Sequence, residues 1–400
     1  MPKLLQINVT SNWGSTGKIA AGIGKTAINN GWDSIIAFGR NANSSDSDLI
    51  RIGNKRDIYY HLIRSRFFDS HGLASKNATL HFIKDIERIS PDIIHLHNIH
   101  GYYLNYPLLF RFLKQWGGPI IWTLHDCWPF TGHCAYFDAV KCTKWQTQCS
   151  KCIQKASYPT SFIDRSFRNF NLKQEIFTSV LEQLTLVPVS DWLNNLLEFS
   201  FLKNARRSMI HNGIDLEIFR PTSTKKQQKK IILGVASIWE ERKGLNDFIK
   251  LSSNLPVNYE IILVGVTPQQ KKILPYNIKG IERTEDIKEL VDLYSKATVF
   301  VNTTREDNFP TVNLESLACG TPVITYRTGG SPEAIDEYTG IVVDKGDVSS
   351  LKTAIETINL CSDRFTVTQC RNRAETYFRK EDKFNEYINL YNNLLQNKTS

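Results

Sequence analysis

The sequence predicts an α/β protein built around two parallel sheets. Runs of apolar residues alternate with helical patterns along the chain, which is typical of βαβ units. Several of these runs are almost continuously apolar, as strands covered by helices on both faces should be. The chain has 400 residues, a length that suits two domains better than one.

Five strands are expected in each half of the chain. Those of the first half are Leu4–Val9, Ser34–Phe38, Ile93–His97, Ile120–Leu124 and Thr185–Val189. Those of the second half are Ile231–Ala236, Glu260–Val264, Val299–Asn302, Pro322–Tyr326 and Gly340–Val343. The polar, charged stretch Asn212–Lys230 between them is interpreted as a linker, in which Gly213 is expected to supply a turn with positive φ. Apolar residues at helical spacing in Lys380–Gln396 predict a last amphipathic helix.

Composition and charge limit the class of protein. The chain is 41% hydrophobic and 22% charged, and no apolar run approaches the roughly 18 to 20 residues that cross a bilayer. The apolar part of the N-terminus is too short for a signal peptide, so the expected compartment is the cytoplasm. Residues 1–188 hold 21 Lys and Arg against 13 Asp and Glu, out of a net charge of +9. This basic half indicates an anionic partner, such as a membrane surface, a lipid pyrophosphate or a nucleic acid.

Lys55–Phe68 mixes cations with aromatic and aliphatic residues. The segment could lie along a bilayer interface, or pack on its domain as an amphipathic helix with a solvated basic face. The sequence leaves both interpretations open.

The stretch Thr303–Ile324 carries the strongest functional signal. A strand leads into a loop with two acids, a helix begins near Pro310, and Gly320 marks its end. A helix start offers N–H groups to a phosphate, and a carboxylate one turn further in can accept hydrogen bonds from a ribose diol. An acid in the preceding loop can hold the hydroxyls of a second sugar. The segment therefore suits a sugar nucleotide, with these candidate residues: Glu306, Asp307, Asn308, Phe309, Pro310, Thr311 and Glu315.

This stretch resembles the signature of the retaining glycosyltransferases of family 4. In that family two glutamates stand eight residues apart before a tail like the Ala318–Ile324 segment of this chain. Glu315 and the tail match. Asp307 occupies the register of the first glutamate, and Glu306 lies one residue earlier.

The resemblance implies the GT-B architecture, in which two doubly wound Rossmann-like domains face each other across a cleft. Residues 1–212 would form the acceptor-side domain and residues 213–378 the nucleotide-sugar-binding domain. Residues 379–400 would form a helix that crosses back to the first domain.

The resemblance also implies an activity. A sugar would pass with retention from a nucleoside-diphosphate sugar to a saccharide or lipid-linked saccharide, in capsule, exopolysaccharide or lipopolysaccharide assembly of the colanic-acid type. Catalysis would need no cofactor, because fixed cations and a helix start stabilise the leaving diphosphate. The expected place is the cytoplasm, at the inner face of the cell membrane, and nucleic acid is not expected as a partner.

Three more donor-site candidates follow from the resemblance. Lys243 precedes a glycine, as does the family's phosphate-binding lysine. Ser237 occupies the position of the family's arginine, and Arg242 is the nearest guanidinium. We assign Lys243 and Arg242 to the diphosphate.

The acceptor-side candidates lie after strands of the first half. His125 matches a family histidine beside the transferred sugar, where it would support the reacting sugar without acting as a general base. Gly14 and Gly17 precede a helix and can let a phosphate approach the backbone. The GK pairs in this region lack the glycine that a P-loop requires five residues earlier. His97 and His100 could line the acceptor groove, or be packed or solvent-facing.

Five of the eight cysteines fall within residues 127–152. Cys134, Cys142, Cys149 and Cys152 end in a CxxC pair, which is good zinc-ligand spacing, although the upstream spacing is looser than in a zinc ribbon. In a reducing compartment such thiols favour metal over disulfides. Structural zinc, free thiols and a disulfide all stay open.

Two other functions share the expected fold. A sugar-nucleotide epimerase would need acid and base residues around the sugar, which the sequence does not single out. An inactive scaffold subunit would account for the two positions that depart from the family pattern, Asp307 and Ser237.

Overall fold

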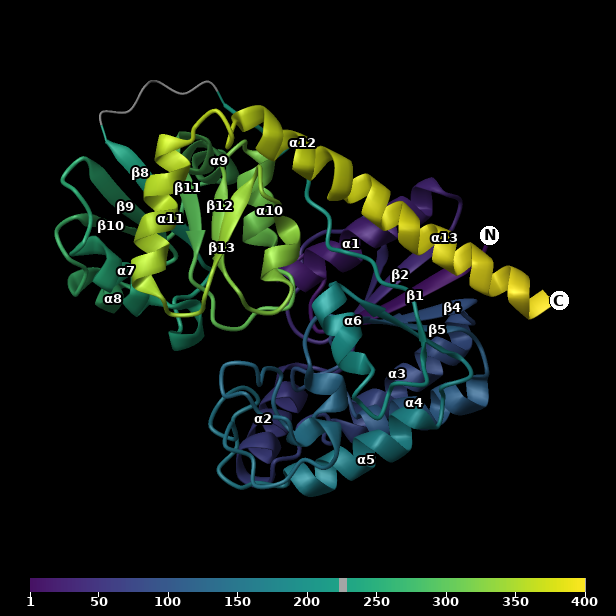
Figure 1. The fold of residues 1–400 in the computed structure, drawn as a ribbon. Coiled ribbons are helices and arrows are strands. Elements are labelled where there is room, and N and C mark those ends of the chain that lie inside the picture. The colour runs from purple at the N-terminus through teal and green to yellow at the C-terminus, as the bar shows by residue number, and fades with distance from the viewer. Residues whose placement is uncertain (223–228, 400) are drawn as a thin grey trace. The chain divides into compact units, whose positions relative to one another are not determined.

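The computed structural model describes residues 1–222 and 229–399, the last three of these by their backbone alone. The chain forms two compact units. Unit 1 comprises Met1–His211 together with Phe384–Ser400, and unit 2 comprises Asn212–Lys383. Each unit contains one parallel sheet between helices (Figure 1).

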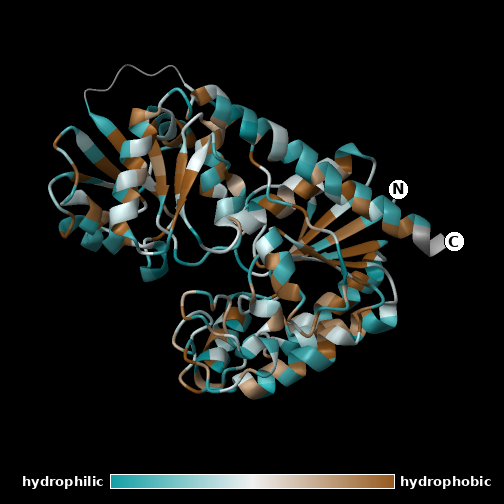
Figure 2. Ribbon diagram, in the orientation of Figure 1, coloured by the Kyte–Doolittle hydropathy of each residue, from teal (hydrophilic) through white to brown (hydrophobic). Residues whose placement is uncertain are grey.

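Unit 1 is built on a seven-stranded parallel sheet in the order β3-β2-β1-β4-β5-β6-β7. The central strands are buried along almost their whole length, because helices cover both faces. The hydropathy colouring shows these strands as apolar ribbons among mixed helices (Figure 2). The strands are β1 Lys3–Asn8, β2 Asp33–Phe38, β3 Asp48–Arg51, β4 Ile93–Leu96, β5 Ile120–Leu124, β6 Leu184–Pro188 and β7 Arg206–Arg207.

The helices of unit 1 include the end of the chain. Phe384, Tyr387, Ile388 and Tyr391 of the last helix are buried in one core cluster with Leu4, at the start of the sheet. The helices are α1 Gly14–Asn29, α2 Lys55–Phe68, α3 Lys76–Ile89, α4 Tyr106–Trp116, η1 Trp128–Phe130, η2 Lys144–Gln146, α5 Ser166–Thr178, α6 Asp191–Leu197 and α13 Lys380–Thr399, of which the part from Phe384 on belongs to this unit.

Unit 2 contains a six-stranded parallel sheet in the order β10-β9-β8-β11-β12-β13. Its strands are β8 Lys230–Val235, β9 Tyr259–Val264, β10 Ile278–Ile281, β11 Val299–Asn302, β12 Val323–Tyr326 and β13 Gly340–Val343. Its helices are η3 Glu241–Lys243, α7 Leu245–Ser252, α8 Pro268–Lys272, α9 Ile287–Lys296, α10 Thr311–Ala318, η4 Ser331–Ala334, α11 Val348–Leu360 and α12 Val367–Tyr377. The strand order reverses direction between β8 and β11, the kind of point where such sheets bind ligands.

The predicted fold class and all ten predicted strands are confirmed, each strand within one residue at either end. Three short strands were not predicted. β3 is mostly exposed, β7 has two residues, and β10 is a partly exposed edge strand interrupted by a glycine. Edge strands lack the two-sided apolar cover that makes a buried strand visible in a sequence.

The linker prediction is wrong for residues 212–222. Ile214, Leu216 and Phe219 are buried in unit 2, and the guanidinium of Arg371 donates hydrogen bonds to the carbonyls of Leu216 and Phe219. Residues 223–228 of the predicted linker lie outside the described residues.

The prediction for Gly213 is also wrong, since its φ is not positive. A Cβ at this position would lie 2.6 Å from the Cα of Lys380. The glycine is needed for a close approach of two backbones and not for a left-handed turn.

None of the helices in the described part of the chain combines the length and apolarity that a bilayer span needs.

Candidate functional site

Three loops of unit 2 meet at the carboxyl edge of its sheet. They follow β8, β11 and β12, which are neighbours in the parallel sheet and therefore end at the same edge. All the predicted donor-site residues from Ser237 to Glu315 lie in the first two of these loops or in the helix that follows. The sheet topology thus gathers residues that are far apart in the sequence.

The helix α10 begins without a side-chain cap. Its N-cap is Pro310, which has extended backbone and offers no side-chain hydrogen bond to the first turn. Buried amides hold the helix in place: Asn302 at the end of β11 donates to Asn313, which in turn donates to the carbonyl of Ser331. The first N–H groups of α10, with the positive end of the helix dipole, form an arrangement that suits a phosphate.

Glu315 lies one turn inside α10 and is oriented by a buried tyrosine. The hydroxyl of Tyr294 in α9 donates a 2.9 Å hydrogen bond to Oε2 of Glu315. Burial, followed by the charge of Glu315 and this hydrogen bond, raises the pKa of Tyr294, so the tyrosine stays a donor. An ionised carboxylate accepts several hydrogen bonds at once, which is the chemistry that a diol needs.

Lys243 and Asp307 form an ion pair, with Nζ 2.6 Å from Oδ2 and both side chains about four-fifths buried, at 19% exposure each. Lys243 lies in η3 after β8, and Asp307 lies in the loop after β11. The ammonium therefore stands beside the loop that leads to α10, where a fixed cation can meet a diphosphate.

The other predicted donor residues divide by environment. Arg242 donates to the backbone carbonyl of Glu306 at 3.1 Å and lies 3.4 Å from Glu240, so this guanidinium helps to hold the loop. Ser237 is exposed and carries no charge that could replace an arginine. The side chain of Glu306 is buried.

Asn308, Phe309 and Pro310 are buried, and Thr311 is partly exposed. The carbonyl of Asn308 accepts from the N–H of Gly330 in the loop after β12, and the carbonyl of Phe309 accepts from the side chain of Asn212. These residues shape the loop, and we assign no chemical role to their side chains.

Sequence reasoning missed a buried acid behind this loop. Asp247 of α7 accepts two hydrogen bonds, of 2.9 and 2.8 Å, from Arg305 and a third from the hydroxyl of Tyr326. Arg305 directly precedes the two acids of the loop. Its ion pair with Asp247 therefore holds the start of this loop in place after β11. The sequence did contain a hint of this acid, because Arg305 stands beside two acids and an arginine that is half-buried requires an anionic partner.

His125 follows β5 in unit 1 and belongs to a chain of hydrogen bonds. Its Nε2 lies 3.1 Å from Nδ1 of His97, and Nε2 of His97 lies 3.0 Å from Oε1 of Gln6. Gln6 donates its amide to the carbonyl of Ala20, so its oxygen must accept from His97. His97 then accepts from His125, which places the proton of a neutral His125 on Nε2.

His97 and His100, predicted on the acceptor side, are both buried. His97 uses both ring nitrogens within the protein, so it orients His125 and does not itself face a groove. His100 lies between the carboxylate of Asp126, 2.8 Å from its Nε2, and the hydroxyl of Tyr158, 2.9 Å from its Nδ1. Burial opposes ionisation of Asp126, but His100 and the N–H of Trp128 lower its pKa below the ordinary value.

We expect the buried histidines to make the protein sensitive to acid. Burial lowers the pKa of His125 to about 4 and that of His61 to about 3, and it also lowers those of His71, His95 and His97 well below the ordinary 6.5. In the unfolded chain these histidines bind protons near pH 6.5, whereas in the folded protein they stay neutral to lower pH. Their contribution to the free energy of unfolding is therefore complete above about pH 6.5 and is lost as the pH falls toward 4.

Each such histidine adds a slope of up to about 1.4 kcal/mol per pH unit to the free energy of unfolding. Urea unfolding at a series of pH values measures this slope. The variant His125→Asn should flatten the fall, because asparagine has no proton to gain. A free energy of unfolding that is constant between pH 7 and 5 would contradict the assignment.

The glycines predicted near a phosphate begin α1. Gly14 has φ +65° and opens the helix, which has no side-chain cap. A Cβ at Gly17 would lie 2.7 Å from the hydroxyl of Thr10, so α1 approaches the loop after β1 closely. Gly17 is buried and is needed for this close approach, whereas a Cβ at Gly14 would have no heavy atom within 4 Å.

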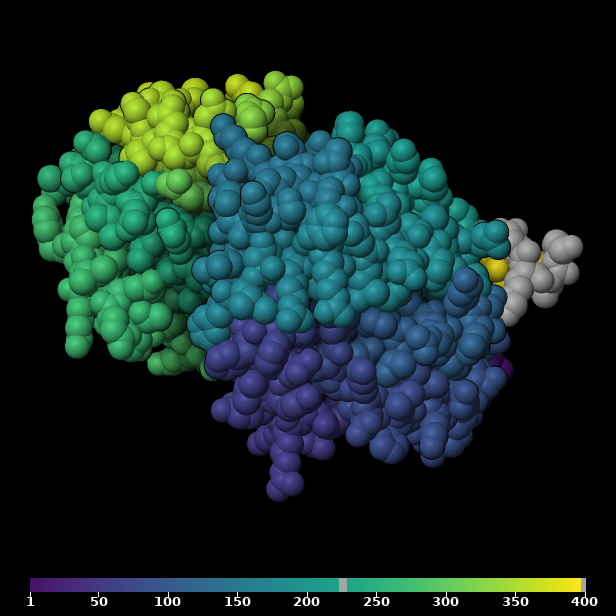
Figure 3. All heavy atoms as spheres, turned by 90° about the horizontal axis from the view of Figure 1, so that it is seen from below, coloured from purple at the N-terminus to yellow at the C-terminus, as the bar shows by residue number. Residues whose placement is uncertain are grey.

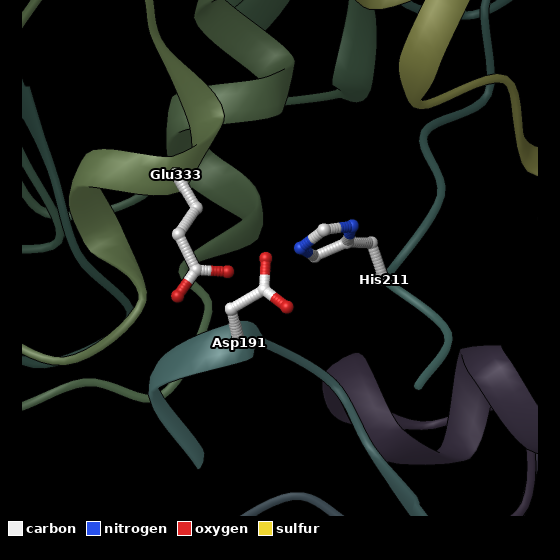
Figure 4. Close-up of side chains that lie close together, drawn as sticks. All are labelled: Asp191, His211 and Glu333. Atoms are coloured by element: carbon white, nitrogen blue, oxygen red, sulfur yellow. The ribbon is translucent and has the colours of Figure 1, made fainter. Parts of the chain in front are cut away.

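Two more polar residues at this edge were not predicted. Asp191 begins α6 directly after β6, and His211 lies in the last segment of unit 1; their side chains approach within 4.8 Å (Figure 4). Glu333, also drawn there, belongs to η4 of unit 2. Asp191 could have been found from the sequence, because it lies just after a predicted strand. The same kind of position led to the choice of His125.

The four cysteines of the predicted metal site come together in the loop between β5 and α5. The thiols of Cys134 and Cys152 form a hydrogen bond, and Cys149 interacts electrostatically with Cys142 and Cys152. Among the described residues, however, no three of the sulfur atoms all lie within 4.8 Å of one another.

Comparison with known proteins adds to this geometry. Residues 25–218 match the family model "Glycosyltransferase Family 4", and residues 229–359 match the model "Glycosyl transferases group 1". The putative colanic acid biosynthesis glycosyl transferase WcaC of Escherichia coli K12 is 23% identical over 419 aligned positions, covering 98% of this chain and 100% of the relative. The capsular polysaccharide biosynthesis glycosyltransferase CapM of Staphylococcus aureus is 26% identical over 205 positions, covering 46% of this chain and 54% of CapM.

Solved structures share the fold. Sucrose-phosphate synthase from Thermosynechococcus elongatus has a TM-score of 0.71 at 18% identity, covering 99% of this chain and 100% of that one. Anabaena HepE in complex with UDP has a TM-score of 0.67 at 13% identity, covering 98% and 100%. Both units thus match glycosyltransferase models, and the chain belongs to the family 4 glycosyltransferases, transferase enzymes with the GT-B fold.

Proposed function

We propose that the protein transfers a sugar, with retention of configuration, from a nucleoside-diphosphate sugar to a saccharide or lipid-linked saccharide. The observation that carries the proposal is the donor end of unit 2. An uncapped helix start lies there with Glu315 inside the helix and the Lys243–Asp307 pair in the preceding loop. The helix start suits the phosphate, the carboxylate of Glu315 suits the ribose diol, and an acid of the preceding loop suits the sugar hydroxyls.

The comparisons support the same donor class. HepE of Anabaena, which shares the fold, is solved with UDP and with UDP-glucose. WcaC and CapM are named for the biosynthesis of colanic acid and of capsular polysaccharide. We therefore place this chain in the assembly of a cell-surface polysaccharide.

Retention in this proposal needs no protein nucleophile. The acceptor hydroxyl attacks the anomeric carbon on the face from which the diphosphate leaves, and a β-phosphate oxygen takes the acceptor proton. Lys243 and the start of α10 stabilise the charge that develops on the diphosphate. His125, held neutral with its proton on Nε2, supports the transferred sugar.

A donor panel tests the proposal. UDP-, GDP- and ADP-sugars are incubated without acceptor, and free nucleotide and free sugar are measured. Slow hydrolysis of one donor is expected. Interconversion of two donors would instead identify an epimerase, and neither binding nor turnover would identify a scaffold. With an acceptor saccharide, proton NMR of the product should show the anomeric configuration of the donor, and inversion would overturn the proposed mechanism.

We further propose that unit 1 contacts the anionic inner face of the cell membrane through α2. Within this helix, His61 and Ser65 are buried, whereas Tyr59 is 65% and Phe67 55% exposed. Tyr59, Ile63 and Phe67 are spaced by four residues and so form one exposed stripe. The helix packs on its domain through the face that carries His61 and Ser65, and the exposed stripe on another face is the observation that supports a contact with the bilayer.

A second segment extends the surface. The N–H of Phe162 donates to the carbonyl of Arg66, and the rings of Phe67 and Phe162 lie 5.3 Å apart. The two segments are neighbours on the face shown in Figure 3. The guanidinium of Arg64 lies over the ring of Phe68, 4.5 Å from its centroid. Exposed rings bordered by cations suit the interface of an anionic bilayer.

A basic pocket adjoins the start of α2. It has a volume of about 640 Å³ and is lined by Trp13, Arg40, Arg51 and Lys55, among other residues. Three cations and no acid in its lining suit the phosphate group of a lipid or of a lipid-linked acceptor.

Co-sedimentation with vesicles tests this contact. We expect binding to phosphatidylglycerol vesicles and little binding to phosphatidylcholine vesicles. Each of Tyr59→Ser and Phe67→Ser should weaken binding by at least about tenfold, since burying an aromatic ring in the interface contributes roughly 1.5–3 kcal/mol. The control Tyr276→Ser removes a fully exposed ring from unit 2 and should change nothing. Equal binding to both kinds of vesicle, or no effect of the α2 variants, would contradict the contact.

A further inference from the structure

The loop between β5 and α5 has little regular structure of its own. Segment 125–165, all of it described, contains only the short turns η1 and η2 as regular elements. Loops of this length in a compact domain usually need an added constraint or a function. Even so, Trp128, Phe130, Trp145 and Cys149 of this loop are buried. Something must hold such a segment in one conformation.

A buried lysine lies against the same loop. Lys173 of α5 is 2% exposed, and its Nζ donates to the carbonyls of Trp128 and Thr131 at 2.6 and 2.9 Å. The ammonium also lies 3.5 Å from the centre of the Trp128 ring. Among the described ion pairs, none joins Lys173 to a carboxylate. A buried cation without a counter-ion is costly, so an anion is expected close by.

The groups able to carry that negative charge include thiols. Burial lowers the pKa of Lys173 to about 7, and the negative charges of Cys149, Cys134, Asp126 and Asp69 oppose this shift. The sulfur of Cys149 also accepts the N–H of Gly132 at 3.2 Å. A backbone N–H directed at sulfur is the surrounding that a thiolate needs.

A histidine beside the thiols has an unpartnered nitrogen. His133 is 3% exposed, and its Nδ1 lies 2.7 Å from Oδ1 of Asp69. Its Nε2 is buried with no hydrogen-bond partner among the described residues. His133 also interacts electrostatically with Cys152. An imidazole that donates one nitrogen to a carboxylate and leaves the other bare is the common form of a metal-binding histidine.

We infer that this loop binds one zinc ion through the thiolates of Cys134, Cys149 and Cys152, with a fourth ligand from Cys142 or His133. Three or four thiolates around Zn²⁺ carry a net negative charge, which Lys173 balances. Ligands about 2.3 Å from the ion lie closer together than any three of the sulfur atoms do here, so at least one side chain must rotate as the shell closes. A filled four-ligand shell leaves no open position, so the ion is structural and cross-links the loop.

Metal analysis of the full chain, purified without chelator, tests the inference. We expect about one zinc per chain, and loss of zinc in Cys149→Ser and in Cys134→Ser. The matched control is Cys361→Ser, which changes an exposed thiol of unit 2 and should retain the zinc. Replacement of zinc by cobalt(II) gives sulfur-to-metal absorption bands whose intensity counts the thiolates. Three or four thiolates support the site, and two or fewer overturn it.

A second measurement uses the wild-type chain, so it tests the inference even if the cysteine variants fail to fold. Treating the wild-type chain with a chelator should change its near-ultraviolet circular dichroism, because Trp128 and Trp145 lie in the loop, and added zinc should restore it. Metal-free protein with an unaltered spectrum and melting temperature would overturn the inference, and so would a Cys134–Cys152 disulfide in the native chain. None of these readouts depends on glycosyl transfer, so this inference and the proposed function can fail separately.

Discussion

Glu315→Ala is expected to weaken binding of the nucleotide-sugar donor by roughly 100-fold. Two hydrogen bonds from a diol to a carboxylate contribute roughly 1.5 kcal/mol or more each, and every 1.4 kcal/mol is about tenfold in affinity. Alanine suits a helix interior, so α10 itself should persist. Isothermal titration calorimetry with the donor, or with its nucleoside diphosphate, measures the effect.

Two variants separate binding from stability. Tyr294→Phe removes the hydroxyl that orients Glu315 but keeps the carboxylate, so donor affinity should fall far less than in Glu315→Ala. Glu356→Ala changes a partly exposed glutamate of α11 that pairs with Lys352 at 3.8 Å, and it should leave donor affinity as in the wild type. Wild-type affinity in Glu315→Ala would exclude this carboxylate from the donor site.

Lys243→Ala is expected to lower kcat by roughly 100- to 1000-fold, the range found when one preorganised group that stabilises developing charge is removed. The lysine stands beside Asp307, so its loss removes a cation from the diphosphate and also leaves a largely buried carboxylate without its partner. Initial rates at saturating donor measure the effect. Lys250→Ala, in the exposed part of α7, is the matched control and should behave as the wild type.

A double-mutant cycle with Asp307→Asn then tests whether the pair acts as a unit. If Asp307 serves to hold Lys243, the double variant should lose little more activity than Lys243→Ala alone. Losses that multiply would show that Asp307 acts independently, for example on the sugar hydroxyls. A wild-type kcat for Lys243→Ala would remove this lysine from the reaction.

The sequence alone was sufficient for the fold class and for the secondary structure around Glu315. Strands covered on both faces must be apolar along their length, so ten of them could be located to within a residue. The strand–loop–helix pattern around Glu315 is local as well, because a helix start, its loop acids and its stop lie within 22 consecutive residues.

Residues whose roles depend on distant partners could not be interpreted from the sequence. Gly213 has a backbone neighbour at Lys380, and the orientation of His125 depends on Gln6 through His97. The three residues of that hydrogen-bond chain come from three different strands or strand ends. Their spacing in the sequence therefore could not predict that they are hydrogen-bonded.

Local chemistry therefore determined which elements form and which residue types stand at their ends. The tertiary structure decided which of those residues meet: Lys243 with Asp307, Tyr294 with Glu315, and Lys173 with the thiols of the cysteine loop. The physical reason is that periodicity and capping act over a few residues, whereas ion pairs and buried hydrogen bonds form wherever the sheet order brings chain segments together.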